Sequence, residues 1–298
     1  MARMKRALLL INGGARQTKE LREKIAPALR NVGLDLIETS ESNPGHFAEL
    51  INRFADKIDM VITAGGDGTS LCAAKALLGK AIPLGVIPLG TANNLARTLE
   101  IPLTIEGAAQ VIGHGHSQKV DVAQVNGNPF LNVSGMGLST QVNKIVPANH
   151  KKRWGLWAYV AYSFSFLHRT KYFKAKVECN GETHSFKSRQ ITICNGKFYG
   201  SGISIAPDAS ANDGLLDLFS AHFTSGWRVF SLIPLYLLKK HSPDKGLHLL
   251  RAPRFTITTV PQINLDTDGE VTSQTPATYE VLNERLTIFT PKPLDKQK

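Results

Sequence analysis

Two glycine-rich segments carry the residues best suited to phosphate chemistry. Gly65-Gly66-Asp67-Gly68-Thr69 and Gly90-Thr91-Ala92-Asn93 each follow a run of apolar residues. Glycines at the end of a strand let backbone N–H groups approach a phosphate closely, and the first turn of a following helix adds partial positive charge. A carboxylate at Asp67 beside a phosphate is repulsive unless a cation lies between them, which gives a physical reason to expect Mg²⁺. The alternative for the first segment is a plain tight turn in which Asp67 caps the helix.

The elements around these segments alternate between strand and helix. The sequence predicts strands at residues 7–11, 34–37, 60–63 and 82–87, and helices at residues 19–32, 46–55 and 70–78. Apolar residues recur at helical spacing in the first of these helices, Pro27 conflicts with that pattern, and Gly33 ends it. The alternation predicts parallel strands joined by crossover helices, so both glycine-rich segments would face one crevice at the carboxyl edge of the sheet.

The pattern changes near residue 120. Asn126-Gly127 and Asn180-Gly181 are strong signals for hairpin turns. Further strands are predicted at residues 120–133, 175–179, 183–186, 190–194, 215–220, 255–259 and 286–289, with helices at 155–167 and 227–238. We therefore expect an α/β nucleotide-binding domain with a parallel sheet over residues 1–120 and a mostly antiparallel β-sandwich domain over residues 121–298. Return of the C-terminal tail to the first domain is left open.

Composition and charge narrow the class of protein. The chain has 298 residues, of which 42% are hydrophobic, and a formal net charge of +11. The length predicts two domains, the composition is that of an ordinary globular protein and argues against disorder, and no apolar run reaches the length of a membrane span. Ten Lys or Arg residues lie within residues 144–189 against two acidic residues. That excess either attracts an anionic partner or forms a solvated face. Three scattered cysteines, Cys72, Cys179 and Cys194, predict a reducing cytoplasm.

The pair of glycine-rich segments, at this spacing, resembles the catalytic domain of the diacylglycerol kinase family. That family includes soluble bacterial lipid kinases and is related to sphingosine and ceramide kinases, whereas the first motif alone is shared with NAD kinases and phosphofructokinases. The second segment continues as Asn93-x-Leu95-Ala96-Arg97, as in the family. Later blocks resemble it too, at residues 132–137, 195–200, 205–217 and 268–270. The resemblance implies a two-domain kinase with a cleft between an α/β domain and a β-rich lipid-substrate domain.

The resemblance also implies roles for single residues. The positions that would contact ATP are Asn12, Thr39, Gly65, Gly66, Asp67, Gly68, Thr69, Ser70, Leu71, Gly90, Thr91 and Asn93. A structural Mg²⁺ would lie at Ser210, Asp213 and Leu215, with the first and last acting through backbone carbonyls. Glu270 would be the general base that takes the proton from a lipid hydroxyl as it attacks the γ-phosphate, while Asp67 acts in catalysis with Mg²⁺.

Several positions depart from the family pattern. Gly13 stands where proline is usual, Ala92 replaces a common glycine, and Asn94 replaces a common aspartate. Ser139-Thr140 stands where many members have Asp-Ala. None of these changes removes Asp67 or Glu270, so the resemblance still implies an active enzyme.

Partners and location follow from the same reasoning. Residues 154–167 are rich in aromatic side chains and have basic residues on both sides. They form either an interfacial helix on anionic lipid or a buried helix with basic ends. The expectation is a cytoplasmic, ATP- and Mg²⁺-dependent lipid kinase of phospholipid biosynthesis that binds the inner membrane face peripherally and reversibly. No nucleic-acid partner is expected, and a homodimer is left open. The alternatives are a nucleotide- or lipid-binding regulator with weak catalysis and an NAD kinase-like enzyme.

Overall fold

The chain divides into two compact units. The computed structural model describes residues 4–12, 18–39, 41, 43–138, 140, 171–199, 203–204, 210–221, 247–282 and 285–292. One unit comprises residues 1–122 and 283–298, and the other comprises residues 123–282.

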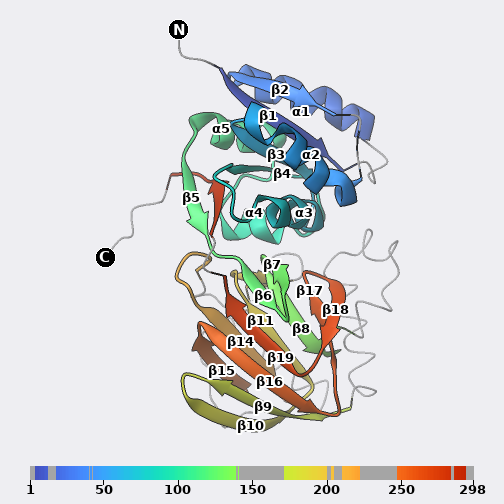
Figure 1. Cartoon of the computed structure of the whole chain (residues 1–298), viewed down its shortest axis with the longest axis vertical. Helices are drawn as coiled ribbons and strands as arrows, with labels where there is room; N and C mark the ends of the chain where they lie inside the picture. The colour runs from blue at the N-terminus through green and yellow to red at the C-terminus, as the bar shows by residue number, and fades with distance from the viewer. Residues whose placement is uncertain are drawn as a thin grey trace. The chain divides into compact units, whose positions relative to one another are not determined.

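The first unit is built on a six-stranded sheet in the order β2-β1-β3-β4-β20-β5. Its strands are β1 (Lys5–Ile11), β2 (Leu34–Glu38), β3 (Met60–Gly65), β4 (Leu84–Pro88), β5 (Ser117–Val120) and β20 (Leu286–Phe289). The pairs from β2 to β20 are parallel, and only β5 runs antiparallel to its neighbour. Consecutive apolar residues in β1, β3 and β4 are buried, as expected for parallel strands that are covered on both faces. Figure 1 shows these strands.

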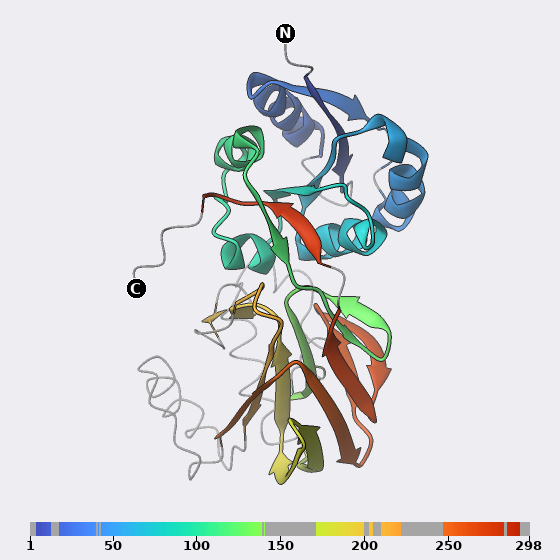
Figure 2. The ribbon, with the colours of Figure 1, turned by 60° about the vertical axis from the view of Figure 1, so that its left-hand side comes forward.

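Helices connect the strands of this sheet. They are α1 (Thr18–Asn31), α2 (Phe47–Phe54), α3 (Asp67–Leu77), α4 (Asn94–Thr98) and α5 (Ile105–His114), with short 3₁₀ turns η1 (Pro44–His46) and η2 (Ala55–Lys57). Helix α1 packs on α5, and α2 packs on α3. Figure 2 shows the two pairs on opposite sides of the sheet. Gly33 has φ +84° after α1, so the predicted glycine stop is confirmed.

The last strand of the chain belongs to the first unit. β20 lies between β4 and β5, with Leu286 opposite Val120. Just before β20, the guanidinium of Arg285 pairs with the carboxylate of Asp121 at 2.8 Å, and the side chain of Asp121 is only 1% exposed. The two chain segments that lead to and from the second unit are thus joined by an ion pair within the first unit.

The second unit contains two six-stranded antiparallel sheets. One has the order β10-β9-β16-β19-β6-β7 and the other β15-β14-β11-β8-β17-β18. The strands of the first are β6 (Ala123–Val125), β7 (Asn128–Phe130), β9 (Phe173–Cys179), β10 (Glu182–Ser188), β16 (Arg254–Val260) and β19 (Ala277–Val281). Those of the second are β8 (Val133–Gly137), β11 (Gln190–Cys194), β14 (Leu216–Ala221), β15 (Leu247–Ala252), β17 (Asn264–Thr267) and β18 (Glu270–Gln274). A small pair, β12 (Phe198–Tyr199) and β13 (Ile203–Ser204), stands apart from both sheets.

Alternating side chains from both sheets fill one core. In β9, every second side chain from Phe173 to Cys179 is buried, and these residues share a cluster with Ile191, Leu218 and Tyr279. Both predicted hairpin turns are confirmed. Asn126-Gly127 joins β6 to β7 and Asn180-Gly181 joins β9 to β10, with positive φ at all four residues, as type I′ turns require.

Two predicted helices, at residues 155–167 and 227–238, lie outside the described residues. Among the helices that the structure describes, none combines the length and apolar character needed to cross a membrane.

Candidate functional site

The two glycine-rich segments leave neighbouring strands at the same edge of the first unit's sheet. β3 and β4 are adjacent and parallel, and Gly65 stands opposite Pro88 in their register. The backbone N–H of Leu89 donates to the carbonyl of Gly65 at 2.8 Å, which carries the pairing one residue past β4. The sheet therefore brings both segments to the edge where α/β folds bind ligands.

The segments touch through backbone atoms. A Cβ atom at Gly90 would lie 2.6 Å from the Cα of Gly66, and one at Gly66 would lie 3.3 Å from the Cα of Gly90. Asn93 adopts a left-handed conformation with φ +50°, and its side chain exchanges two hydrogen bonds of 2.8 Å with the backbone of Gly90. This exchange fixes the tight turn that presses Gly90 against Gly66, so Asn93 shapes the segment through its own side chain.

Asp67 links the two segments. It is the first residue of α3, and its carboxylate accepts hydrogen bonds of 3.0 Å from the backbone N–H groups of Asn94 and Leu95. These two groups open α4, so Asp67 caps that helix from a distance and its negative charge meets the positive end of the helix dipole. Each carboxylate oxygen accepts one hydrogen bond here, which leaves further lone pairs for a cation.

The start of α3 is suited to an anion. Gly66 is the N-cap residue of this helix and, as a glycine, has no side chain that could cap it. A Cβ atom at Gly68, in the first turn, would meet nothing within 4 Å. At Gly65, a Cβ atom would lie 2.4 Å from the Oγ1 of Thr69. That hydroxyl accepts a hydrogen bond of 3.0 Å from the side-chain amide of Asn12, the residue after β1.

These features fit the phosphates of ATP and one Mg²⁺. The N–H groups at the start of α3 can bind phosphate oxygens, and the open space at Gly68 admits them. Within the described ranges, no group of three His, Cys, Asp or Glu side chains could hold a metal by itself. Mg²⁺ is commonly bound by one or two carboxylates together with phosphate oxygens, which Asp67 allows. The Oδ1 of Asn94, whose backbone N–H contacts Asp67, is buried, and the described residues supply no hydrogen-bond donor to it.

The predicted ATP contacts do not all present a side chain. Asn12, the residues from Gly65 to Leu71, and the segment from Gly90 to Asn93 come together at one edge of the sheet. Thr69, Ser70 and Leu71 have buried side chains, and the hydroxyl of Ser70 lies 3.5 Å from that of Thr63. They can therefore serve a nucleotide mainly through their backbone. Thr91 is exposed.

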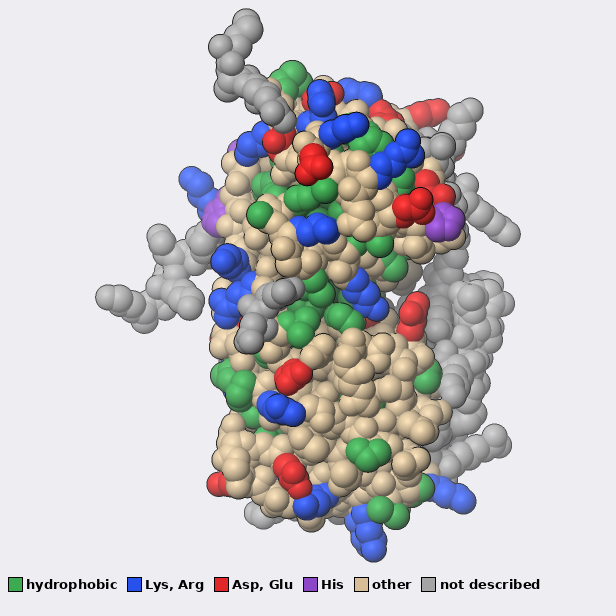
Figure 3. Space-filling view, in the orientation of Figure 1, with side chains coloured by type: hydrophobic (Ala, Val, Ile, Leu, Met, Phe, Trp, Pro, Cys, Tyr) green, Lys and Arg blue, Asp and Glu red, His purple; other side chains and the backbone are tan. Residues whose placement is uncertain are grey.

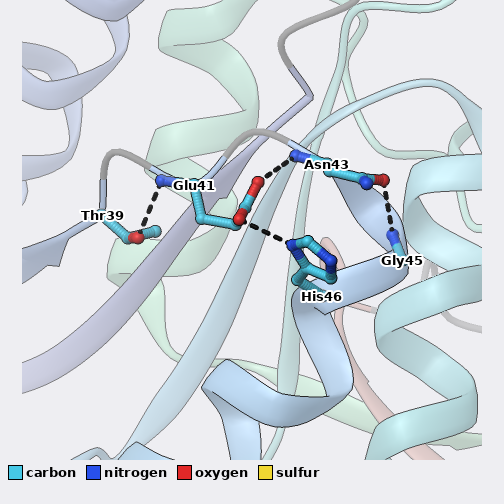
Figure 4. A network of polar contacts seen from close by, with 5 residues as sticks. All are labelled: Thr39, Glu41, Asn43, Gly45 and His46. Carbon is cyan, nitrogen blue, oxygen red and sulfur yellow. Dashed lines mark hydrogen bonds and ion pairs between the residues drawn. The ribbon is translucent and has the colours of Figure 1, made fainter.

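Thr39 lies just beyond the end of β2 and belongs to a separate polar network (Figure 4). Its hydroxyl accepts a hydrogen bond of 3.0 Å from the backbone N–H of Glu41. The carboxylate of Glu41 accepts the N–H of Asn43 and pairs with the Nδ1 of His46, both at 2.7 Å. The hydrogen bond and the charge of Glu41 raise the pKa of His46 above its ordinary value.

In the second unit, three of the sequence blocks meet at one point. The carboxylate of Asp268 accepts hydrogen bonds from the backbone N–H groups of Leu131, Asn132 and Val133 at 2.8, 3.1 and 3.1 Å. From another side, the side-chain amide of Asn195 donates to the carbonyl of Leu131 at 2.9 Å. The blocks at residues 132–137, 195–200 and 268–270 thus share one hydrogen-bonded cluster.

Glu270, the predicted base, is the first residue of β18 and is exposed. It follows Asp268 by two residues, so its backbone position depends on the turn that Asp268 anchors. Sequence reasoning alone does not find this role of Asp268, because an Asp-Gly pair signals only a turn.

At the predicted structural metal site, the positive charge beside Asp213 is that of an arginine side chain. The carboxylate of Asp213 pairs with the guanidinium of Arg251 and also accepts the backbone N–H of Leu215 at 3.0 Å. Arg251 lies 3.6 Å from the carboxylate of Asp217 as well. The hydroxyl of Ser210 donates to the side chain of Asn212 at 2.6 Å. The guanidinium of Arg251 already neutralises the carboxylate of Asp213, so a divalent cation bound there would have to displace the guanidinium or lie close to a like charge.

The departures from the family pattern have different surroundings. Asn94 keeps its backbone contact with Asp67. Thr140 is buried, and its hydroxyl donates to the carboxylate of Asp266 at 3.1 Å. An alanine at this position could not make this hydrogen bond. Gly13 and Ser139 lie outside the described residues.

The basic segment is described only in part. Residues 141–170, including the aromatic stretch, lie outside the described residues. Within the described part, Lys174 and Lys176 project outward from β9, and the guanidinium of Arg189 lies 4.1 Å from the ring centre of Tyr172. On the face drawn in Figure 3, Lys and Arg side chains are interspersed with acidic and neutral ones.

Comparisons with known proteins agree with this picture. Residues 6–125 match the diacylglycerol kinase catalytic domain, and residues 132–290 match the YegS C-terminal NAD kinase beta sandwich-like domain. A diacylglycerol kinase of Bacillus subtilis is 29% identical over 239 residues, which cover 79% of each chain. An uncharacterised protein of Synechocystis is 32% identical over 239 residues, and the match covers 78% of this chain and 54% of that protein. The chain thus spans about half the length of that relative.

A solved structure, that of a diacylglycerol kinase from Bacillus anthracis, superposes with a TM-score of 0.76 at 27% identity and covers 98% of this chain and 99% of its own. These matches confirm the predicted fold class, an α/β domain followed by an antiparallel β-sandwich, and they indicate the predicted class of enzyme, a lipid kinase. The chain therefore belongs to the diacylglycerol kinase catalytic-domain family.

Proposed function

We propose that this chain is an ATP-dependent lipid kinase that transfers the γ-phosphate to the hydroxyl of diacylglycerol or a related lipid. The observation that carries the proposal is the backbone contact between Gly66 and Gly90 beside the uncapped start of α3. A polyphosphate needs such a surface of N–H groups without intruding side chains. The similarity to proteins named diacylglycerol kinase supports a lipid as the acceptor.

The roles of the chain's own groups follow from phosphoryl-transfer chemistry. The first turn of α3 and the segment from Gly90 to Asn93 hold and orient the phosphates, and Asp67 binds the accompanying Mg²⁺. When bound, Mg²⁺ would neutralise part of the negative charge of the phosphates. Glu270 accepts the proton of the lipid hydroxyl while the oxygen of that hydroxyl forms a bond to the γ-phosphorus. The bond between the γ-phosphorus and the oxygen that bridges it to the β-phosphate breaks at the same time, and ADP leaves. An exposed carboxylate at the start of a strand suits a group that must reach a substrate.

Two further elements belong to the proposal. A structural Mg²⁺ at Ser210, Asp213 and Leu215 is proposed only for a form in which Arg251 has moved away from Asp213, and not for the form in which the two side chains are paired. The enzyme would act in the cytoplasm and bind the inner membrane face peripherally, through basic side chains and anionic headgroups. Sedimentation with vesicles of anionic lipid, but not with neutral vesicles, would support that binding, and equal sedimentation with both would contradict it.

The test is an assay with labelled ATP, Mg²⁺ and a panel of acceptors that includes diacylglycerol, ceramide, sphingosine and NAD, with identification of the product. We expect a phosphorylated lipid, a large fall in kcat to a small residual rate in Glu270→Gln, and retained nucleotide binding in that variant. The matched control is Glu182→Gln, which neutralises an exposed carboxylate elsewhere in the second unit and should keep the rate. Labelled NADP as the product would overturn the lipid assignment. ATP turnover without lipid dependence would favour a weakly catalytic regulator.

A further inference from the structure

We propose that Asp268 is a positioning residue that holds the turn bearing Glu270 in the orientation needed for proton transfer. The proposal rests on the role proposed above for Glu270. The sequence motifs gave Asp268 no role of its own. The proposal also explains why the blocks at residues 132–137, 195–200 and 268–270 are joined by hydrogen bonds.

The contacts of Asp268 are unusually complete for a residue in a turn. One carboxylate oxygen accepts the backbone N–H of Leu131, and the other accepts those of Asn132 and Val133. The backbone N–H of Asp268 donates in return to the carbonyl of Val133 at 2.9 Å. Four hydrogen bonds therefore join this residue to one short segment, and three of them are strengthened by the charge of the carboxylate.

The same turn fixes where Glu270 begins its strand. Asp268 has φ +49° and Gly269 has φ +96°, and the turn that they form places Thr267 opposite Glu270 at the start of the β17–β18 pair. β17 is itself paired with β8 through Thr267 and Ser134. Because only Gly269 separates the anchored residue from the base, a shift of the anchor is transmitted directly to the backbone of Glu270.

The partner segment is held from its other side. Asn195 donates its side-chain amide to the carbonyl of Leu131 and its backbone N–H to the carbonyl of Asn132, both at 2.9 Å. The residues from Leu131 to Val133 are buried. The N–H groups that receive Asp268 are therefore preorganised, and the carboxylate meets a fixed surface.

Replacement of Asp268 by asparagine leaves one acceptor oxygen and puts an NH₂ group among three N–H donors, so part of the anchor becomes repulsive. A displacement of about 1 Å at a catalytic group costs on the order of 100-fold in rate. We expect Asp268→Asn to lower kcat by about 10- to 100-fold while KM for ATP changes by less than about twofold. Asp268→Glu keeps the charge but moves it by one methylene, and an intermediate loss is expected.

The experiment measures kcat, KM for ATP and thermal unfolding for the full chain and for Asp268→Asn, Asp268→Glu, Glu270→Gln and the double variant Asp268→Asn/Glu270→Gln. The matched control is Asp59→Asn, in which a carboxylate that accepts the backbone N–H of Arg6 at 2.7 Å in the first unit is neutralised. The control should keep kcat. The double variant should be no slower than Glu270→Gln alone, because a residue that acts only through the base has nothing left to position.

The outcomes separate the two proposals. If Glu270→Gln lowers kcat to a small but measurable residual rate and both Asp268 variants keep the full kcat, the positioning role is wrong and the proposed base stands. An Asp268→Asn loss that recurs in full on top of Glu270→Gln would show a general structural effect and would also overturn the inference. If Glu270→Gln keeps its rate, the proposed base itself fails. Should Asp268→Asn not fold, Asp268→Glu carries the comparison.

Discussion

The Cα atom of Gly66 lies so close to Gly90 that Gly90 has no room for a side chain, whereas a Cβ atom at Gly66 would be tight against Gly90, at 3.3 Å. A Cβ atom at Gly90 would stand 2.6 Å from the backbone of Gly66 and 2.8 Å from Asn93. Backbone atoms cannot rotate away as a flexible side chain does, so the two segments must separate to admit a methyl group. This contact makes two segments from different strands into one surface.

Gly90→Ala should therefore weaken nucleotide binding by at least about tenfold and lower the free energy of unfolding by about 1–3 kcal/mol. Isothermal titration with a nonhydrolysable ATP analogue and chemical denaturation measure the two effects. Gly68→Ala is the informative companion, because a Cβ atom there meets nothing within 4 Å of the protein. It should leave stability unchanged or raise it slightly, as glycine-to-alanine changes in helices do. Normal stability and normal nucleotide binding in Gly90→Ala would contradict the assigned contact.

Asp67 has a structural task that is separable from any task with Mg²⁺. Its carboxylate caps α4 through Asn94 and Leu95, so Asp67→Ala should lower the free energy of unfolding by about 1–2 kcal/mol even without nucleotide and metal. The control is Thr104→Ala. It removes the cap at the start of α5, where the Thr104 hydroxyl accepts the N–H of Gly107 at 3.2 Å. Both variants should lose stability on urea denaturation, and only Asp67→Ala should also lose transfer. An unchanged urea midpoint for Asp67→Ala would show that the cap contributes nothing.

The parts of this fold that the sequence predicts well are those set by neighbouring residues. The Asn-Gly hairpins and the Gly33 helix stop depend on backbone conformations that few residues adopt, so their identity carries the prediction. The arrangement of the glycine-rich segments also follows from local pattern, since successive strands with crossover helices place their carboxyl ends together.

Contacts between distant residues are not visible in such patterns. Asp67 caps a helix that begins 27 residues later, and Asp268 reaches a segment more than 130 residues earlier. The pairing of β20 with β4 is of the same kind, because nothing in its sequence says which unit it joins. The guanidinium of Arg251 beside Asp213 is another, and it changes what the predicted metal site can hold.

The contact between Arg251 and Asp213 leads to a prediction about metal dependence. With the guanidinium in place, the melting temperature of the protein should be the same in Mg²⁺ and in EDTA. Arg251→Met removes the guanidinium from Asp213, leaving a carboxylate that a divalent cation can neutralise. The melting temperature of Arg251→Met should then be lower in EDTA and rise with Mg²⁺. Arg254→Met is the control, since its partner Glu280 lies outside the predicted site. A large EDTA effect on the unaltered protein would instead support a bound structural metal.

The pair formed by Glu41 and His46 predicts a pH dependence at the end of β2. The pKa of His46 is raised, first by its hydrogen bond with Glu41 and then by the charge of that carboxylate. The folded state therefore holds this proton more tightly than the unfolded state, in which the pKa is 6.5. The stabilisation is fully present below pH 6.5 and is lost as the pH rises through the raised pKa of the folded protein.

If the network orders Thr39 for the nucleotide, affinity for an ATP analogue should fall over the same range. Titration of His46 by NMR should show the raised pKa, and Glu41→Gln should lower it and remove the pH dependence of affinity. A His46 pKa that does not respond to Glu41→Gln would show that the carboxylate is not the cause.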